Sequence, residues 1–418
     1  MTNDRADLVV VGAGTVGGWA SVFAARDGAG RVVVLDRGFA GQGASSRAAG
    51  IVRAQGGTPT TVALGRWSID FYRRQRAELA TDSGFRELGY LILAVTAEDE
   101  QAGRARVAMQ HAAGLTDVRW LDAAEAAALA TNLAPTGHRG GSYRAADGHI
   151  DPPRNVRAYS LAMAAAGVEL REGTTFTGLR TAPAPGGRRV VAVDTDSGTI
   201  ETERVILTGG PSLRDVGRRA GVRVPAGAVR HTVAVLEPHA AFADPQPMVF
   251  DIGAGLYWRL EEDGLLFGWS DPNDRPGEAR AIDWAMYDAM RERLAAFVPV
   301  TRGLALRRIW AATIDFTPDH LPILGPALLP DGSPIGGVTI ASAGGHGMMW
   351  GPAVARVAAD LALTGETGVI DVTDLGLDRF DASGRSRLAT DPIALPFPLD
   401  AAEESVELVE TVVPTGAG

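Results

Sequence analysis

Three glycines near the start of the chain have the spacing of a phosphate-binding turn, Gly-x-Gly-x-x-Gly. Gly12 allows a tight turn, Gly14 lets backbone amides approach a pyrophosphate, and Gly17 lets a helix pack closely on a strand. Asp36 follows roughly 20 residues later, where a carboxylate can accept hydrogen bonds from ribose hydroxyls. This combination predicts a dinucleotide site, and the acid at position 36 argues against a 2′-phosphate and therefore against NADP.

The residues around these glycines predict the strand–helix–strand unit that would position them. The apolar runs 8–11 and 32–35 are typical of parallel strands buried on both faces. A helix is expected from Thr15 to Ala25, so Thr15 and Val16 would lie in its first turn. Free N–H groups and the positive end of the helix dipole at that turn favour a phosphate.

A second segment, residues 41–53, follows Asp36 and is rich in small and hydroxyl residues. Small residues permit close approach to a ligand, while hydroxyls and an arginine can bind a pyrophosphate. We therefore expect this segment to contact the cofactor, although a plain surface loop is the alternative. Its predicted contacts are Ser45, Ser46, Arg47, Ala49 and Gly50, and further contacts are predicted at Arg37 and Thr175.

The bulk composition limits the class of protein. A length of 418 residues exceeds a comfortable single core, so two domains are expected. The net charge of −10 disfavours a nucleic-acid partner. All 40 basic residues are arginine, and the absence of cysteine excludes disulfides, thiolate metal sites and thiol nucleophiles. The first predicted strand begins by residue 7 and no apolar run reaches about 18 residues, so we expect a cytoplasmic protein without a signal peptide or membrane span.

The middle of the chain mixes strand and helix patterns. Residues 189–194 and 201–206 predict a hairpin around the turn 196–198. Further strands are expected at 229–236, 255–260, 264–269 and 304–314, and an amphipathic helix at 279–297. Two later strands, at 205–207 and 337–341, run into glycine-rich turns.

Four stretches, in this order, resemble the D-amino-acid oxidase superfamily of flavoproteins, in its sarcosine oxidase and glycine oxidase branch. They are the stretches 12–17, 43–53, 205–210 and 317–326, the last together with the turn 344–347. The resemblance implies FAD in an extended pose and an α/β fold. A Rossmann-type FAD-binding domain with a parallel sheet would comprise residues 1–85, 146–222 and 312–385. An α+β substrate domain with a mostly antiparallel sheet would comprise residues 86–145 and 223–311, and an arm would follow at 386–418.

The same resemblance implies cofactor contacts at the two later glycine turns. These contacts are Thr208, Gly209 and Gly210 in the first turn, and Gly344, Gly345, His346, Gly347 and Met348 in the second. A helix expected at 353–363 begins just after the second turn. Its N–H groups and dipole could stabilise the negative charge that a reduced flavin carries on its pyrimidine edge.

Departures from the family pattern matter most for the chemistry. Relatives attach FAD through a cysteine at the position of Ala312 or a histidine at the position of Arg47, so non-covalent FAD is expected here. Sarcosine oxidase relatives use an arginine matching Arg53 and an oxygen-activating lysine matching Met349. Only the arginine is kept, which makes Arg53 the predicted carboxylate anchor. Both O2 and another electron acceptor stay open as oxidants.

Three more residues are predicted in the substrate site. Tyr257 resembles a substrate-facing tyrosine of glycine oxidase relatives, although a tyrosine in a strand is about as often core. Arg259 would point to the same face of that strand. Asp315 is the best match to a carboxylate-binding arginine of those relatives, and in the pocket it would attract a cationic amine. The alternative is a surface acid, or a partner of Arg307 or Arg308.

His346 is the histidine expected near the flavin, where it could assist oxygen reduction as a cation. The alternative is a purely structural histidine that holds the turn through a hydrogen bond. Together with Arg53, Tyr257, Arg259 and Asp315 it completes the predicted catalytic set.

These predictions converge on an FAD-dependent amine oxidoreductase. Hydride would pass from the carbon beside the amine of a small amino acid or N-alkyl amino acid to flavin N5, and water would hydrolyse the resulting imine. One alternative is a 2-hydroxy-acid oxidoreductase with His346 or His320 as base; the other is a flavin-binding assembly protein without turnover. A homodimer is a further expectation.

Overall fold

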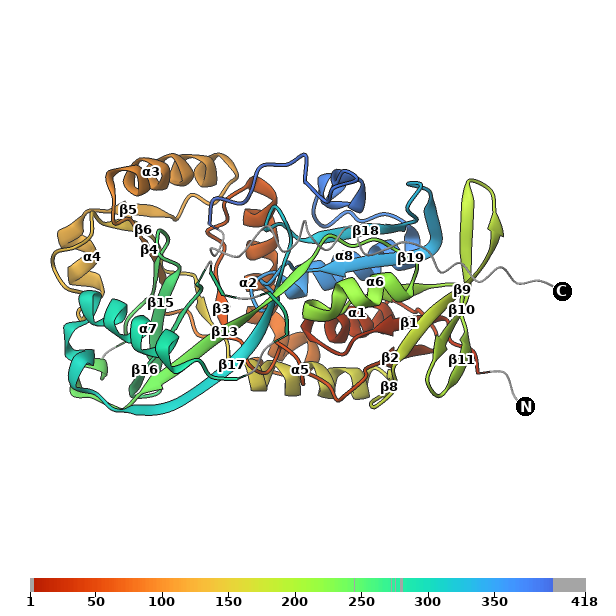
Figure 1. The fold of residues 1–418 in the computed structure, drawn as a ribbon, viewed down its shortest axis with the longest axis horizontal. Coiled ribbons are helices and arrows are strands. Elements are labelled where there is room, and N and C mark those ends of the chain that lie inside the picture. The colour runs from red at the N-terminus through yellow and green to blue at the C-terminus, as the bar shows by residue number, and fades with distance from the viewer. Residues whose placement is uncertain (1–3, 244, 272, 275, 279–280, 394–418) are drawn as a thin grey trace.

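Two large sheets form the body of the protein in a computed structural model, which describes residues 4–393 except 244, 272, 275 and 279–280. One sheet has nine strands and the other eight, within those described residues, and they occupy opposite ends of the long axis in Figure 1. A short ribbon of β3 (Ile51–Val52) and β7 (Gly148–His149) forms a third, two-stranded sheet. The predicted α/β fold class, with one mostly parallel and one mostly antiparallel sheet, is confirmed.

The centre of the nine-stranded sheet is parallel. Its order is β19 (Pro334–Ser342), β12 (Val205–Leu207), β1 (Leu8–Val11), β2 (Val32–Leu35) and β8 (Glu169–Arg171). Every residue of β1, β2 and β12 is buried, as the unbroken apolar runs require. β18 (Ile323–Leu328) pairs antiparallel with β19.

An antiparallel extension alters the predicted hairpin. β10 (Gly187–Thr195) pairs with β11 (Gly198–Glu201) around the expected turn, and also with β9 (Phe176–Ala184). The second hairpin strand therefore ends at Glu201, and the prediction that it continues to residue 206 is wrong. Val205 instead pairs in parallel with Val9 of β1, because the apolar run 205–207 is buried on both faces in the sheet centre.

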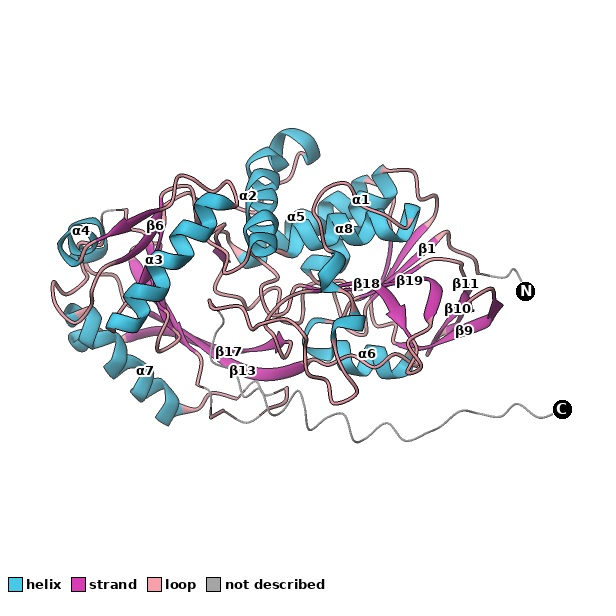
Figure 2. Cartoon of the chain, turned by 90° about the horizontal axis from the view of Figure 1, so that it is seen from above, coloured by secondary structure: helices cyan, strands magenta, loops and turns pink. Residues whose placement is uncertain are grey.

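Helices cover both faces of this sheet. Figure 2 shows α1 (Thr15–Arg26), α5 (Pro152–Ala165) and α8 (Gly351–Thr364) on one side of the strands and α6 (Leu213–Arg219) on the other. The long helix α2 (Pro59–Leu79) packs against α8. Aromatic side chains fill the space between α1 and α2, where Trp19 meets Phe71 edge to face at 5.0 Å.

The eight-stranded sheet is antiparallel except for one parallel pair, β4 with β14. Its strands, in spatial order, are β17 (Leu306–Phe316), β13 (Gly227–Leu236), β16 (Gly264–Trp269), β15 (Leu256–Glu261), β14 (Met248–Asp251), β4 (Tyr90–Leu93), β6 (Gly141–Arg144) and β5 (Arg119–Leu121). β17 passes through residue 312 and stays in this sheet to Phe316. The predicted domain boundaries stay a prediction.

Three helices accompany this sheet: α3 (Ala97–Ala112), α4 (Ala123–Leu129) and α7 (Trp284–Phe297). The helix predicted at 279–297 begins only at Trp284, because the Asp283 carboxylate caps it by accepting the Met286 N–H. Residues 279 and 280 lie outside the described part of the chain, as do residues 394–418 of the predicted arm. Within the described residues, no helix combines the length and apolar character needed to cross a membrane.

Candidate functional site

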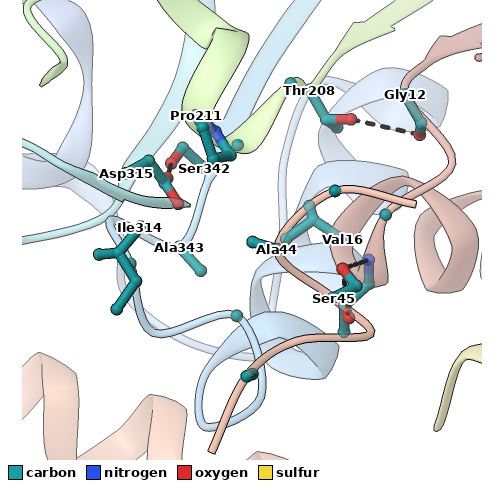
Figure 3. A pocket seen from close by; sticks show the side chains of 18 of the residues that line it. Gly12, Val16, Ala44, Ser45, Thr208, Pro211, Ile314, Asp315, Ser342 and Ala343 are labelled. Atoms are coloured by element: carbon teal, nitrogen blue, oxygen red, sulfur yellow. Dashed lines mark hydrogen bonds between the residues drawn. The ribbon is translucent and has the colours of Figure 1, made fainter. Parts of the chain in front are cut away.

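A cavity of about 510 Å³ lies where the two sheets meet. Its lining includes five separated parts of the chain: the β1–α1 turn, the loop 41–53, the turn after β12, the end of β17 around Ile314, and the turn around His346. Figure 3 shows the first three converging, with Gly12, Ser45 and Thr208 on one side and Asp315 with Ser342 on the other. The tertiary fold thus brings together the stretches that the sequence singled out.

The β1–α1 turn is shaped by contacts that only glycine allows. Gly12 has φ +99°, and a Cβ there would lie 2.6 Å from Thr208 Oγ1. A Cβ on Gly17 would overlap the Gly12 carbonyl oxygen. Thr208 Oγ1 donates to the Val11 carbonyl at 2.6 Å, which ties the first turn to the turn after β12. Gly12, Gly14 and Gly17 line the cavity at the N-terminus of α1 and form a glycine cradle, a position that suits a phosphate.

The loop 41–53 closes over this cradle. Ser45 Oγ accepts the Thr15 N–H at 3.0 Å, so the hydroxyl lies at the first turn of α1. Arg47 turns its guanidinium back to the carbonyls of Gln42 and Gly43, and thereby holds the loop's own shape. Asp36 accepts the N–H groups of Ala13 and Gly38, both at 2.8 Å.

Most of the predicted contacts line the cavity. They are Gly12, Gly14, Thr15, Val16, Gly17, Asp36, Arg37, Ser45, Arg47, Ala49, Gly50, Thr175, Thr208, Gly209, Gly210, Gly345, His346, Gly347 and Met348, together with Arg53, Tyr257 and Asp315 of the predicted catalytic set. Ser46, Gly344 and Arg259 are not in the lining.

Arg259 differs most from its predicted role. It shares a strand face with Tyr257, as expected, and is buried. Its guanidinium, however, donates to the Ala49 carbonyl at 2.9 Å and forms an ion pair with Glu261 at 2.6 Å. Arg259 therefore supports the loop that carries Ala49 and does not face the cavity.

Tyr257 belongs to a buried polar row that the sequence did not reveal. Its hydroxyl lies 2.6 Å from His231 Nε2, and His231 Nδ1 lies 3.2 Å from Ser270 Oγ. Burial lowers the pKa of His231 to about 4, so the ring is neutral at pH 7. A neutral ring that accepts from Ser270 and donates to Tyr257 leaves the phenolic proton for a group in the cavity. The only sequence signal was a histidine in the strand predicted at 229–236, which pairs with Ala312.

Arg53 and Asp315 lie in the lining with different environments. Arg53 is 4% exposed, donates to the Gln55 carbonyl and lies 5.8 Å from the Tyr90 ring. Asp315 is buried and accepts from Ser342 Oγ at 2.9 Å, and burial raises the pKa of its carboxyl. It is not a surface acid.

The alternative partners proposed for Asp315 are engaged elsewhere. Arg307 pairs with Glu262 at 2.9 Å and Arg308 with Glu261 at 3.1 Å. The interpretation of Asp315 as a partner of Arg307 or Arg308 is therefore wrong.

The glycine turn before α8 completes the site. Gly345 has φ +84°, and a Cβ there would overlap the Asp315 carbonyl oxygen. His346 Nδ1 lies 3.0 Å from the Gly344 carbonyl, and its ring lies 4.2 Å from Trp350. Burial, with the charge of Arg53, lowers the pKa of His346 to about 3. The expectation of an imidazolium is therefore not met in this structure, since the ring is neutral at pH 7.

A family model described as FAD dependent oxidoreductase (DAO) matches residues 7–361. The chain belongs to this family. FAD is the cofactor that the DAO family implies, and the glycine cradle and the hydroxyl-rich loop that line the cavity fit an extended dinucleotide. The predicted resemblance is confirmed.

Individual relatives of this DAO-family chain are similar at modest identity. The 4-methylaminobutanoate oxidase (formaldehyde-forming) of Paenarthrobacter nicotinovorans is 27% identical over 91% of this chain and 46% of its own length. Mitochondrial sarcosine dehydrogenase of Mus musculus is 28% identical over 77% of this chain and 36% of its own length. The chain thus spans less than half of these relatives. The structure of glycine oxidase from Geobacillus kaustophilus superposes with a TM-score of 0.77 at 26% identity, covering 91% of this chain and all of that one.

Proposed function

We propose that this protein oxidises the C–N bond of a small amino acid or N-alkyl amino acid, with FAD held non-covalently. Gly12, Gly14 and Thr15 would hold the diphosphate, and the turn at Gly345 would hold the pyrimidine edge. The bound cofactor would accept a hydride from the carbon beside the amine, and water would hydrolyse the imine. Ala312, where relatives carry a cysteine, supports non-covalent attachment.

The observation that carries this proposal is the neutral polar row beside a buried cation. An amine must be deprotonated to lose a hydride, because its lone pair forms the C=N bond. Burial and, to a smaller extent, the charge of Arg53 lower the pKa of His346, and both would lower the pKa of an ammonium bound in this cavity in the same way. The phenolic O–H of Tyr257 would then donate a hydrogen bond to a carboxylate or carbonyl of the substrate.

Arg53 is also the proposed anchor for a substrate carboxylate. We expect Arg53→Ala to weaken the binding of carboxylated amines more than that of simple alkyl amines, which have no carboxylate to pair with Arg53. The similarity to a 4-methylaminobutanoate oxidase and to a sarcosine dehydrogenase supports this substrate class.

The hydroxy-acid alternative needs a base with a pKa near 7. Burial lowers the pKa values of His231 and His320 to about 4 and contributes most to the value of about 3 at His346, which does not favour that chemistry. A cytoplasmic location and a homodimer stay predictions.

An anaerobic screen tests the proposal. The purified protein would be mixed with N-methyl amino acids, D-amino acids, cyclic imino acids and hydroxy acids. Flavin reduction would be recorded as loss of absorbance at about 450 nm. Bleaching by an amine is the expected result. Bleaching by hydroxy acids alone would contradict it, and bleaching by nothing would favour a binding protein. Readmission of air then separates oxidase from dehydrogenase, since a reduced flavin that persists for minutes indicates another acceptor.

A further inference from the structure

The end of the described chain reaches the cavity. We call residues 386–393 the carboxy-terminal arm. Ile393 is 2% exposed and lines the cavity. It packs in one apolar cluster with Tyr90, Phe250 and Tyr257. One wall of the cavity therefore comes from a segment that follows the family-matched region, residues 7–361.

The arm is anchored at Asp391. The Asp391 N–H donates to the Asp319 carbonyl at 2.9 Å, and the Asp391 carboxylate accepts the Ile393 N–H at 2.8 Å. This carboxylate is 4% exposed and interacts electrostatically with Arg53 and Arg106. Burial outweighs these two attractions and raises the pKa of the Asp391 carboxyl, so the two hydrogen bonds are what hold the arm in place.

Close packing against Gly57 also positions the arm. A Cβ on Gly57 would overlap Asp391 Oδ1 and lie 2.7 Å from Pro392 Cδ. Gly57 itself is not in the cavity lining, so a side chain there would move the arm without entering the cavity.

The Ile393 main chain reaches the proposed carboxylate anchor. The Ile393 carbonyl oxygen accepts from Arg53 Nη2 at 3.5 Å, and the Gln55 carbonyl oxygen accepts from Arg53 Nη1. Two backbone acceptors thus occupy part of the guanidinium. The side chain and the carbonyl of Ile393 both limit the space beside Arg53.

We propose that Ile393 is a specificity-determining residue of the substrate pocket, which limits the length of the carboxylated substrate that fits between Arg53 and the wall of Tyr90, Phe250 and Tyr257. This inference rests on the proposed function. Truncation of Ile393 opens apolar volume next to the anchor, so longer acids gain contact while short acids do not. A difference of a few methylene groups in such a pocket is typically worth at least ten-fold in discrimination.

Binding of straight-chain carboxylates from acetate to hexanoate tests the inference in the full-length, FAD-loaded protein. Perturbation of the flavin absorbance spectrum would report dissociation constants for wild type, Ile393→Ala and the arm control Leu388→Ala. Leu388 is half-buried in the same arm and is not in the cavity lining. We expect the hexanoate-to-acetate affinity ratio to rise at least ten-fold in Ile393→Ala and to stay unchanged in Leu388→Ala.

A second variant, Gly57→Ala, should shift the ratio in the same direction by displacing the arm. An unchanged affinity ratio in both Ile393→Ala and Gly57→Ala overturns the inference. So does an equal change of the ratio in Leu388→Ala. Failure of wild type and all variants to bind any of the acids overturns it too. Failure of the proposed function shows separately, as the absence of flavin bleaching by amines in wild type.

Discussion

Removal of the Tyr257 hydroxyl is the sharpest test of the site. In Tyr257→Phe the ring and its packing stay, while His231 Nε2 loses a partner at 2.6 Å in a fully buried position. A buried polar group without a partner costs about 1–3 kcal/mol. The substrate carboxylate or carbonyl loses its phenolic donor only in the reacting complex, so the same cost there should slow amine-driven flavin reduction by about 5- to 150-fold, since about 1.4 kcal/mol is a factor of ten.

The assay is anaerobic stopped-flow reduction of the bound flavin over a range of amine concentrations. The limiting rate should fall while FAD stays bound, because Tyr257 is not among the residues proposed to hold the cofactor. Tyr143→Phe is the matched control, since Tyr143 lies in the same sheet but outside the cavity lining. A limiting rate within two-fold of wild type, or an equal loss in the control, would refute a role for the polar row.

The pH dependence of the same reaction gives an internal check. Because the pKa of His231 is held near 4 by burial, the histidine stays neutral from pH 6 to pH 9. The rate should therefore rise towards the pKa of the substrate amine. If the pH-dependent rise of the rate disappeared in His231→Asn, the titrating group would be the histidine, and this would contradict the structure.

Three further outcomes are expected. Gly17→Ala should abolish FAD retention, measured as the flavin-to-protein absorbance ratio, because its Cβ would overlap the Gly12 carbonyl oxygen. Arg379→Met should lower the free energy of unfolding by about 3–5 kcal/mol, because it leaves Asp319, 1% exposed and bound through two oxygens at 2.7 and 3.0 Å, without a counter-charge; Arg379→Met combined with Asp319→Leu should recover most of that loss in urea unfolding. The free energy of unfolding should also decrease as the pH is lowered from about 6.5 towards 4. Burial lowers the pKa values of His149 and His231 to about 3 and 4 in the folded protein, so only the unfolded chain takes up protons on these histidines in that range. A urea midpoint that stays constant between pH 7 and pH 5 would contradict this.

Element boundaries show where sequence patterns reach their limit. The helix expected at 15–25 is observed at Thr15–Arg26, because its glycine turn and its C-terminal stop are local signals. The sequence pattern predicts one hairpin strand over 201–206, although Glu201 and Val205 belong to different strands. A short apolar run can pair with a strand close by in sequence or with a distant strand, and its own sequence does not tell which of the two it joins.

The sequence by itself determined the cofactor class and the turns that would hold it. Gly17 and Asp36 act through contacts with Gly12, Ala13 and Gly38, which lie in or next to the same strand–helix–strand unit, so their spacing carries the information. The tertiary structure alone decided the substrate side. Arg259 turned out to support Ala49, His231 joined Tyr257 across neighbouring strands, and Ile393 entered the cavity from the arm. These roles depend on which side chains meet across two sheets and a distant segment, and no spacing along the chain encodes such meetings.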